Sequence, residues 1–159
     1  MKKEIKENKL VLNWLSIPLS LKLVFIIVLV GLGSSTYLLS LTYNGGYSFF
    51  GFDFLGVKAL LLSLVIDIFG SIAVLVSIWF AKKWGFGYTL GYFGFLILNG
   101  ILSVIALKQR IDAFGDQFGG VPAVHKALFM EVIISGIVGF SIYLLILILI
   151  TRNKKYFEK

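Results

Sequence analysis

The sequence of 159 residues contains no cysteine, one histidine and few charged residues. Without cysteine, the chain has no disulfide, no thiolate metal ligand and no thiol redox centre. The lone His125 and eight scattered carboxylates provide no ligand set for zinc, haem or an iron–sulfur cluster, so we expect no metal and no cofactor. Charged residues make up only 14% of the chain, whereas a soluble domain carries roughly 25%. Most of the chain therefore lacks the polar surface that a water-exposed domain needs.

Hydrophobic residues are abundant instead, at 58% of the chain and a mean hydropathy of +0.95. Crossing a bilayer takes roughly 20 predominantly apolar residues. Four blocks reach or approach that length, at residues 21–41, 58–80, 86–107 and 127–151. The sequence therefore predicts one all-α, polytopic integral membrane domain with four transmembrane helices in an antiparallel bundle. The remaining segments are a juxtamembrane segment 1–20, outer loops 42–57 and 108–126, and a tail 152–159.

The net charge of +7 is concentrated at alternate ends of these spans. Eleven of the 15 Lys and Arg residues lie before or just inside the first span, in the 81–85 turn and in the tail, against four in the other two connections. This is the positive-inside bias, so we expect both termini to be cytoplasmic in a multi-pass protein of the cell membrane. The same charge predicts contact with anionic lipid on the cytoplasmic side, and we expect no nucleic-acid partner.

The N-terminal region allows two further interpretations. Residues 2–32 superficially resemble a signal peptide, but the charged region is long and apolar residues resume at 37–41, which favours a retained first helix. Residues 1–20 either lie along the inner membrane surface or form a solvated tail with Trp14 at the headgroups. Both alternatives stay open for the segment before Pro18.

Polar side chains within the apolar blocks are the main functional candidates, because charge in hydrocarbon is costly. Asp67 lies near the middle of the second span, and the short 81–85 turn brings Asn99 of the third span to the same depth. The candidate intramembrane polar site comprises Asp67, Asn99, Ser35, Ser135 and Glu131.

This polar site has two interpretations. In one, Asp67 is a cation or proton site, Asn99 is a neutral ligand and Glu131 lies at the outer mouth. In the other, a protonated Asp67 is hydrogen-bonded to Asn99 and to serines and holds the bundle together. We favour the structural interpretation, since cross-helix hydrogen bonds are common in membrane bundles.

No catalytic set stands out. His125 has no nucleophile partner, and the i, i+4 pair Asp112 and Asp116 is typical of a solvated helix face. We therefore expect no enzyme activity and no catalytic residue.

Residues 85–95, "GFGYTLGYFGF", contain four glycines. Their spacing is out of register with the dinucleotide-binding G-x-G-x-x-G, and a Lys-Lys-Trp turn precedes them instead of a strand. Gly87, Gly91 and Gly94 instead recur at helical spacing, with Gly87 and Gly91 forming a small-xxx-small motif. The candidate helix-packing residues are Gly87, Gly91, Gly94, Ser135 and Gly139.

Two functions from different classes remain. The first is a non-catalytic membrane subunit or scaffold, a homo- or hetero-oligomer that packs on partner transmembrane helices or lipid. Its outer loop of aromatic residues, 43–54, is expected at the outer interface as an aromatic belt or on a partner protein. The second is a small oligomeric transporter or channel that uses Asp67 and Asn99. We favour the first, because one bundle of four short helices leaves little room for a substrate path.

Overall fold

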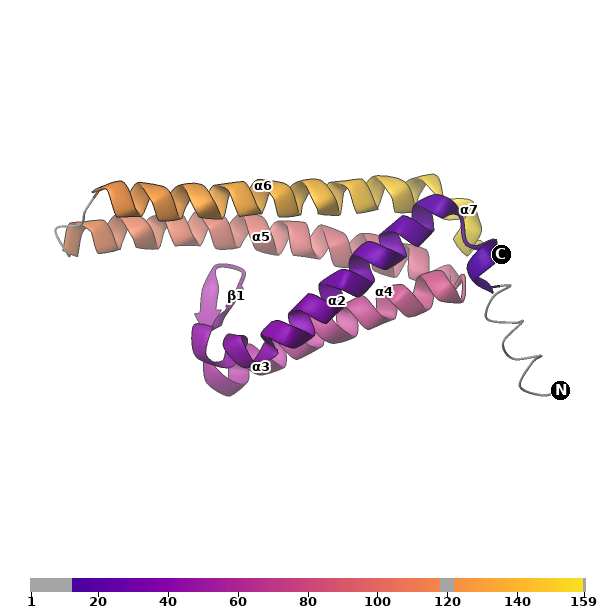
Figure 1. Cartoon of the computed structure of the whole chain (residues 1–159), viewed down its shortest axis with the longest axis horizontal. Coiled ribbons are helices and arrows are strands. Elements are labelled where there is room, and N and C mark those ends of the chain that lie inside the picture. The colour runs from indigo at the N-terminus through magenta and orange to yellow at the C-terminus, as the bar shows by residue number, and fades with distance from the viewer. Residues whose placement is uncertain (1–12, 118–121, 159) are drawn as a thin grey trace.

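The computed structural model describes residues 13–117 and 122–158, which are mostly helical (Figure 1). In chain order the elements are α2 (Leu19–Gly45), β1 (Tyr47–Phe49), β2 (Phe52–Phe54), α3 (Gly56–Ser63), the π-helical segment η1 (Leu64–Phe69), α4 (Gly70–Trp79), α5 (Lys83–Gln117), α6 (Pro122–Arg152) and α7 (Lys154–Phe157).

Three helical stretches among the described residues are long and apolar enough to cross a membrane. They are Leu19–Leu39, Gly56–Trp79 and Lys83–Ala106, which correspond to the first three predicted spans. The expected fourth span falls within α6, whose described apolar part is Gly136–Arg152. The chain therefore has the character of a helical membrane protein, and its fourth span stays a prediction.

The helix ends follow local chemistry. Pro18 lies immediately before α2, where its fixed φ of −55° and missing N–H disturb no helical hydrogen bond. Helix α5 does not end near Leu107 but continues to Gln117, so the first part of the predicted outer loop 108–126 is helical. At 35 residues α5 is about 52 Å long, well beyond a hydrocarbon core of about 30 Å. Its second half therefore extends past the apolar layer.

The helices form two arms that meet at one end and diverge at the other (Figure 1). One arm contains α2 with the continuous α3–η1–α4 rod, and the other contains the antiparallel pair α5 and α6. The turn between α4 and α5 and the α6–α7 connection both lie at the closed end. The chain thus forms a V rather than an evenly packed bundle.

The closed end of the V carries the hydrophobic core. The core residues Ile17, Leu21, Ile78, Ile150 and Phe157 are all almost fully buried there, and Phe93 of α5 belongs to the same cluster. The Asn153 amide also donates a hydrogen bond to the Ser20 hydroxyl at 2.8 Å, which ties the start of α2 to the end of α6. The two described ends of the chain therefore lie together.

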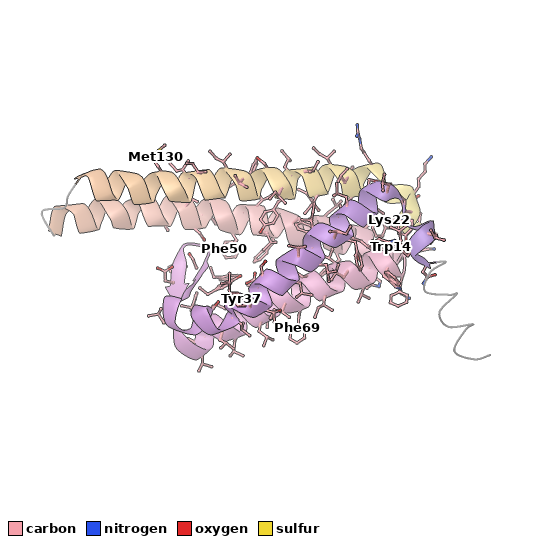
Figure 2. All side chains as sticks on the ribbon, in the orientation of Figure 1. Trp14, Lys22, Tyr37, Phe50, Phe69 and Met130 are labelled. Carbon is pink, nitrogen blue, oxygen red and sulfur yellow. The ribbon has the colours of Figure 1, made fainter. Side chains whose placement is uncertain are left out.

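Trp14 is part of this closed end and packs on it through ring contacts. Its ring lies 6.1 Å from the Trp79 ring and 5.7 Å from the Phe25 ring, and the Lys22 ammonium lies 5.4 Å from its centre. Figure 2 shows Trp14 and Lys22 near the start of α2. Residues 1–12 lie outside the described ranges, so the two interpretations of that segment stay open.

A short β-hairpin bridges the open end of the V (Figure 1). Tyr47 pairs with Phe54, Ser48 with Asp53 and Phe49 with Phe52, around a two-residue turn of Phe50 and Gly51 with φ of 50° and 82°. The Phe49 and Phe50 rings lie 6.0 and 5.5 Å from the Phe95 ring of α5. The Phe49 and Phe50 rings thus pack on α5 of this chain, while Phe52 is 71% exposed, and the belt at the membrane interface or on a partner protein stays a prediction.

Candidate functional site

Asp67 lies in η1, where the backbone is wound more widely than in an α-helix. The Gly70 N–H bonds to the Val65 carbonyl five residues earlier, which is the hydrogen bond of a π-helix. The Tyr47 hydroxyl donates to Asp67 Oδ1 at 3.0 Å, and the Ser63 hydroxyl donates to Oδ2 at 2.9 Å. Each carboxylate oxygen of Asp67 thus has a hydroxyl donor.

Of these two hydrogen bonds, the one from Tyr47 joins residues farther apart in the sequence. Tyr47 belongs to the hairpin and lies outside the three span-length helices. Burial, and after it the neighbouring Asp67 carboxylate, raises the pKa of the Tyr47 phenol well above its usual range. The phenol therefore keeps its proton at all physiological pH values. It is a permanent donor to Asp67.

Asn99 holds the turn of the hairpin from the other arm. Its Oδ1 accepts the Phe50 N–H at 2.6 Å, and its Nδ2 donates to the Ser48 carbonyl at 3.5 Å. A two-residue hairpin leaves the N–H of its first turn residue without a partner in the strand ladder. Asn99 satisfies that group, and it does so at a residue whose positive φ is unfavourable for a bulky side chain.

The turn also makes two direct contacts with α5. The Ser48 hydroxyl donates to the Ser103 hydroxyl at 3.2 Å. Gly51 lies so close to α5 that a Cβ built on it would be 2.8 Å from the Ala106 Cβ. Glycine is therefore required at this position by both its φ and its proximity to the helix.

Two tyrosines of α5 complete the polar contact with the rod. The Tyr92 hydroxyl donates to the Ile66 carbonyl within η1 at 3.1 Å and accepts from the Ser71 hydroxyl at 3.3 Å. The Tyr88 hydroxyl donates to the Gly70 carbonyl at 3.4 Å. Gly70 faces the Tyr92 ring so closely that a Cβ would overlap it. These contacts use carbonyls of the π-helical segment and the turn that follows it.

The predicted polar residues are therefore only partly brought together. Asp67 and Asn99 do not bond to each other; the hairpin connects them through Tyr47 on one side and Phe50 on the other. Ser35 makes no hydrogen bond to either residue. The side chains of Ser135 and Glu131 lie outside the described residues, as do those of His125 and the Asp112–Asp116 pair.

Sequence reasoning missed the hairpin residues Tyr47, Ser48 and Phe50. A signal was present in the alternation of aromatic and polar residues, Tyr47-Ser48-Phe49 and Phe52-Asp53-Phe54, on either side of Phe50-Gly51. Such alternation around a two-residue turn indicates a hairpin. The membrane context, and an apparent excess of aromatics for a loop, favoured an interfacial belt instead.

A second candidate surface is an uncovered face of α5. A Cβ placed on Gly87, Gly91 or Gly94 would have no heavy atom within 4 Å, so no described part of this chain packs on them. The same face continues with three apolar side chains that are about half exposed, Leu98 at 51%, Ile101 at 46% and Ile105 at 51%. We call these six residues the α5 seam.

The α5 seam has a regular spacing of four, three, four, three and four residues. This spacing is the repeat that keeps one face of a helix against a partner helix in a left-handed pair. The seam extends about 27 Å at 1.5 Å per residue, which nearly matches the thickness of the apolar layer. Its glycine half permits close approach of a second backbone, and its Leu and Ile half offers side chains for interdigitation.

A cavity adjoins the second half of the α5 seam. It has a volume of about 580 Å³ and opens between α5 and α6, where Gly100, Gly136 and Gly139 provide no side chains to fill it. Ile101 and Ile105 belong to both the seam and the cavity lining. Gly139, a predicted packing residue, has no heavy atom within 4 Å of a built Cβ.

No protein-family model, curated protein or solved structure matches this chain. Within residues 13–117 and 122–158, no group of three or more His, Asp or Glu side chains is arranged to hold a metal ion. The assignment of function therefore depends on the geometry of the polar cluster and of the α5 seam.

Proposed function

We propose that the protein is a non-catalytic membrane subunit that packs the α5 seam against a transmembrane helix of a second chain. The observation that carries this proposal is the seam itself, six residues in heptad spacing whose three glycines no described residue covers and whose three apolar side chains are about half exposed. In a membrane, where lipid tails are as apolar as leucine, small residues promote helix association by close van der Waals packing.

The polar cluster supports the same proposal. Asp67 and Asn99 each bind the hairpin, and this use of their hydrogen-bonding groups gives them a structural role. The hairpin also holds the rod and α5 in fixed positions on either side of it. A subunit of this kind presents a preformed helix face without having to reorganise first, which lowers the cost of association.

The test is a Gly91→Leu substitution at the centre of the glycine half of the seam. A Cβ built on Gly91 meets no heavy atom within 4 Å among the described residues, so folding is expected to be retained, while the partner backbone is pushed away. We expect at least about a tenfold weakening of association, about 1.4 kcal/mol. Native gels or mass photometry of complexes extracted in mild detergent would measure it.

The matched control is Gly33→Leu in α2. Gly33 is also open, with no heavy atom within 4 Å of a built Cβ, but the residues four positions before and after it are Leu29 and Tyr37, so it belongs to no small-xxx-small motif. Its association should equal that of the wild type. Equal complexes for all three proteins, or equal losses in the two variants, would refute an interface at the seam.

Transport through an Asp67 site is the second candidate function. The observation in its favour is the position of Asp67 within a π-helical segment, since such segments are frequent at functional sites. Asp67→Asn retains the shape and the ability to accept hydrogen bonds, so assembly should persist while any ion-dependent flux in proteoliposomes is lost. Unchanged flux in that variant would exclude Asp67 as the ion site.

A further inference from the structure

A small pocket lies at the closed end of the V, where α5 begins and α6 leads into α7. Its volume is about 250 Å³, and it is lined by Lys83, Phe86, Lys154, Phe157 and Glu158. Two separate elements therefore each contribute one lysine and one phenylalanine. None of these residues takes part in the polar cluster or in the α5 seam.

The floor of the pocket is aromatic and firmly held. Phe157 is 1% exposed and belongs to the core of the closed end. Its ring lies 6.2 Å from the Phe86 ring, and the Lys154 ammonium lies 5.9 Å from the centre of that ring. The phenylalanines thus fix the base of the pocket, while the lysines provide its charge.

The charge of the pocket is positive. Its two lysines outnumber its single carboxylate, and Lys83 forms no ion pair with any residue that the structure describes. Lys154 pairs with Glu158 at 3.6 Å, but the two side chains are 61% and 58% exposed. An exposed i, i+4 pair of this kind is weak and easily exchanged for a stronger anion.

The position of the pocket along the span indicates which kind of molecule would supply that anion. Lys83 is the first residue of the span-length helix Lys83–Ala106, so the pocket lies where the apolar layer gives way to the headgroup region. We propose that this pocket binds the phosphate of an anionic phospholipid, whose acyl chains extend along α5 and α6. Basic pockets between transmembrane helices are suited to such headgroups, whereas charge spread over the surface gives only diffuse attraction.

Glu158 provides a test that distinguishes a defined pocket from diffuse attraction. In the bound state a phosphate would compete with this carboxylate for Lys154 and would be repelled by it. Glu158→Gln should therefore strengthen phospholipid binding, and Lys83→Gln or Lys154→Gln should weaken it, each by about fivefold. The matched control is Lys155→Gln, which removes an exposed neighbouring charge that does not line the pocket.

The experiment uses the full chain in mild detergent, with native mass spectrometry counting bound phosphatidylglycerol against phosphatidylcholine. The wild type should retain phosphatidylglycerol selectively. Glu158→Gln should retain more phosphatidylglycerol than the wild type, and Lys155→Gln should retain the same amount. Lys83→Gln and Lys154→Gln should each retain less. Thermal unfolding in the same detergent verifies that the variants are folded.

Three results would overturn the proposal. Equal retention of the two lipids would mean that the pocket does not select anionic headgroups. An effect of Lys155→Gln as large as that of Lys83→Gln would indicate diffuse charge attraction. Displacement of the lipid by inorganic phosphate at millimolar concentration would show a site for a free anion rather than for a phospholipid.

Discussion

At the scale of single residues, Tyr47 and Asn99 join the hairpin to the rod and to α5 at the open end of the V. Tyr47 belongs to the hairpin, and its phenol donates a hydrogen bond to Asp67 of the rod. Asn99 belongs to α5, and its amide oxygen accepts a hydrogen bond from the Phe50 N–H of the hairpin. Removing one partner of a buried hydrogen bond costs more than the bond contributes, because the other partner stays buried and unsatisfied. Single substitutions here should therefore have measurable effects.

The first prediction concerns the Tyr47 hydroxyl. Tyr47→Phe leaves Asp67 with Ser63 as its remaining hydroxyl donor and should lower the free energy of unfolding by about 1–3 kcal/mol. Tyr37→Phe is the control, since Tyr37 is 82% exposed and its loss of a hydroxyl should have almost no effect. Unfolding in detergent, followed by circular dichroism, measures both. Equal stabilities of the two variants would contradict the assigned role of Tyr47.

A second prediction concerns alkaline pH. Burial raises the pKa of Tyr47 and the pKa of Tyr156, whose hydroxyl donates to the Ile78 carbonyl at 2.9 Å. An unfolded tyrosine has a pKa of about 10. Above that pH the unfolded chain releases protons that the folded chain keeps, so the stability these groups contribute is complete below about pH 10 and falls as pH rises further.

The measurement is the unfolding midpoint in detergent from about pH 8 to about pH 11. The double variant Tyr47→Phe and Tyr156→Phe should start from a lower stability but lose less of it over this range than the wild type. A decline as steep as that of the wild type would show that other groups account for the alkaline loss.

At the scale of elements, the hairpin links the two arms at the open end of the V. It spans from the rod to α5 and contacts both through short polar bonds and aromatic rings (Figure 2 labels Phe50 on it). Because the helices diverge on this side, the hairpin replaces the helix–helix packing that is missing there. The open end of the V is therefore held by eight residues of irregular hydrophobicity rather than by a continuous helical seam.

A third prediction uses the absence of native cysteine, which makes any introduced disulfide unambiguous. The Ser48 and Ser103 hydroxyl oxygens are 3.2 Å apart, so Ser48→Cys with Ser103→Cys should oxidise to an intrachain disulfide across a separation of 55 residues. A loop of that length is expected to stabilise the fold by about 4 kcal/mol.

Intact mass and non-reducing peptide mapping detect this bond, and thermal unfolding measures its effect. The control pair is Ser48→Cys with Ser71→Cys, since the Ser71 hydroxyl faces Tyr92 instead. Formation of both disulfides with equal yield would mean that the hairpin is not held on α5 as described.

The sequence allowed the helices and part of the polar cluster to be predicted, for physical reasons. Long apolar blocks must form helices in a membrane because backbone groups need internal partners, and the short 81–85 turn forces antiparallel neighbours. The same turn placed Asp67 and Asn99 at a similar depth, on neighbouring helices. The hairpin could not be predicted in the same way, because strands of three residues show little periodicity. Its position also depends on hydrogen bonds to the Asp67 and Asn99 side chains, which lie far from it in the sequence.

At the scale of the whole molecule, both described ends of the chain and the α4–α5 turn lie at the closed end of the V (Figure 1). This arrangement is compatible with the four predicted crossings and with the concentration of Lys and Arg at the same end. We propose that this end faces the cytoplasm, in line with the positive-inside bias. The fourth crossing, through α6, then returns the chain to its starting side.

A fourth prediction tests that topology by sided labelling. Lys82→Cys and Lys155→Cys, both exposed at the closed end, should react with a membrane-impermeant maleimide only after the cells are permeabilised. Lys58→Cys, which is exposed near the start of α3 at the other end of the rod, should react in intact cells. Labelling of Lys82→Cys and Lys155→Cys on opposite sides would contradict the fourth crossing.

The π-helical segment has a consequence for how the length of this chain can change. Each turn of a π-helix holds more residues than the 3.6 of an α-helix, so η1 contains in effect one residue that an uninterrupted rod would not need. One residue corresponds to a rotation of about 100° between α3 and α4. A one-residue deletion within Leu64–Phe69 would be absorbed by conversion of η1 to an α-helix, which leaves α3 and α4 in nearly the same relative rotation, whereas a deletion elsewhere in the rod would shift that rotation by about 100°. The π-helical segment is thus the part of the second span that can lose a residue while Ser63 and the attached hairpin keep their side toward α5.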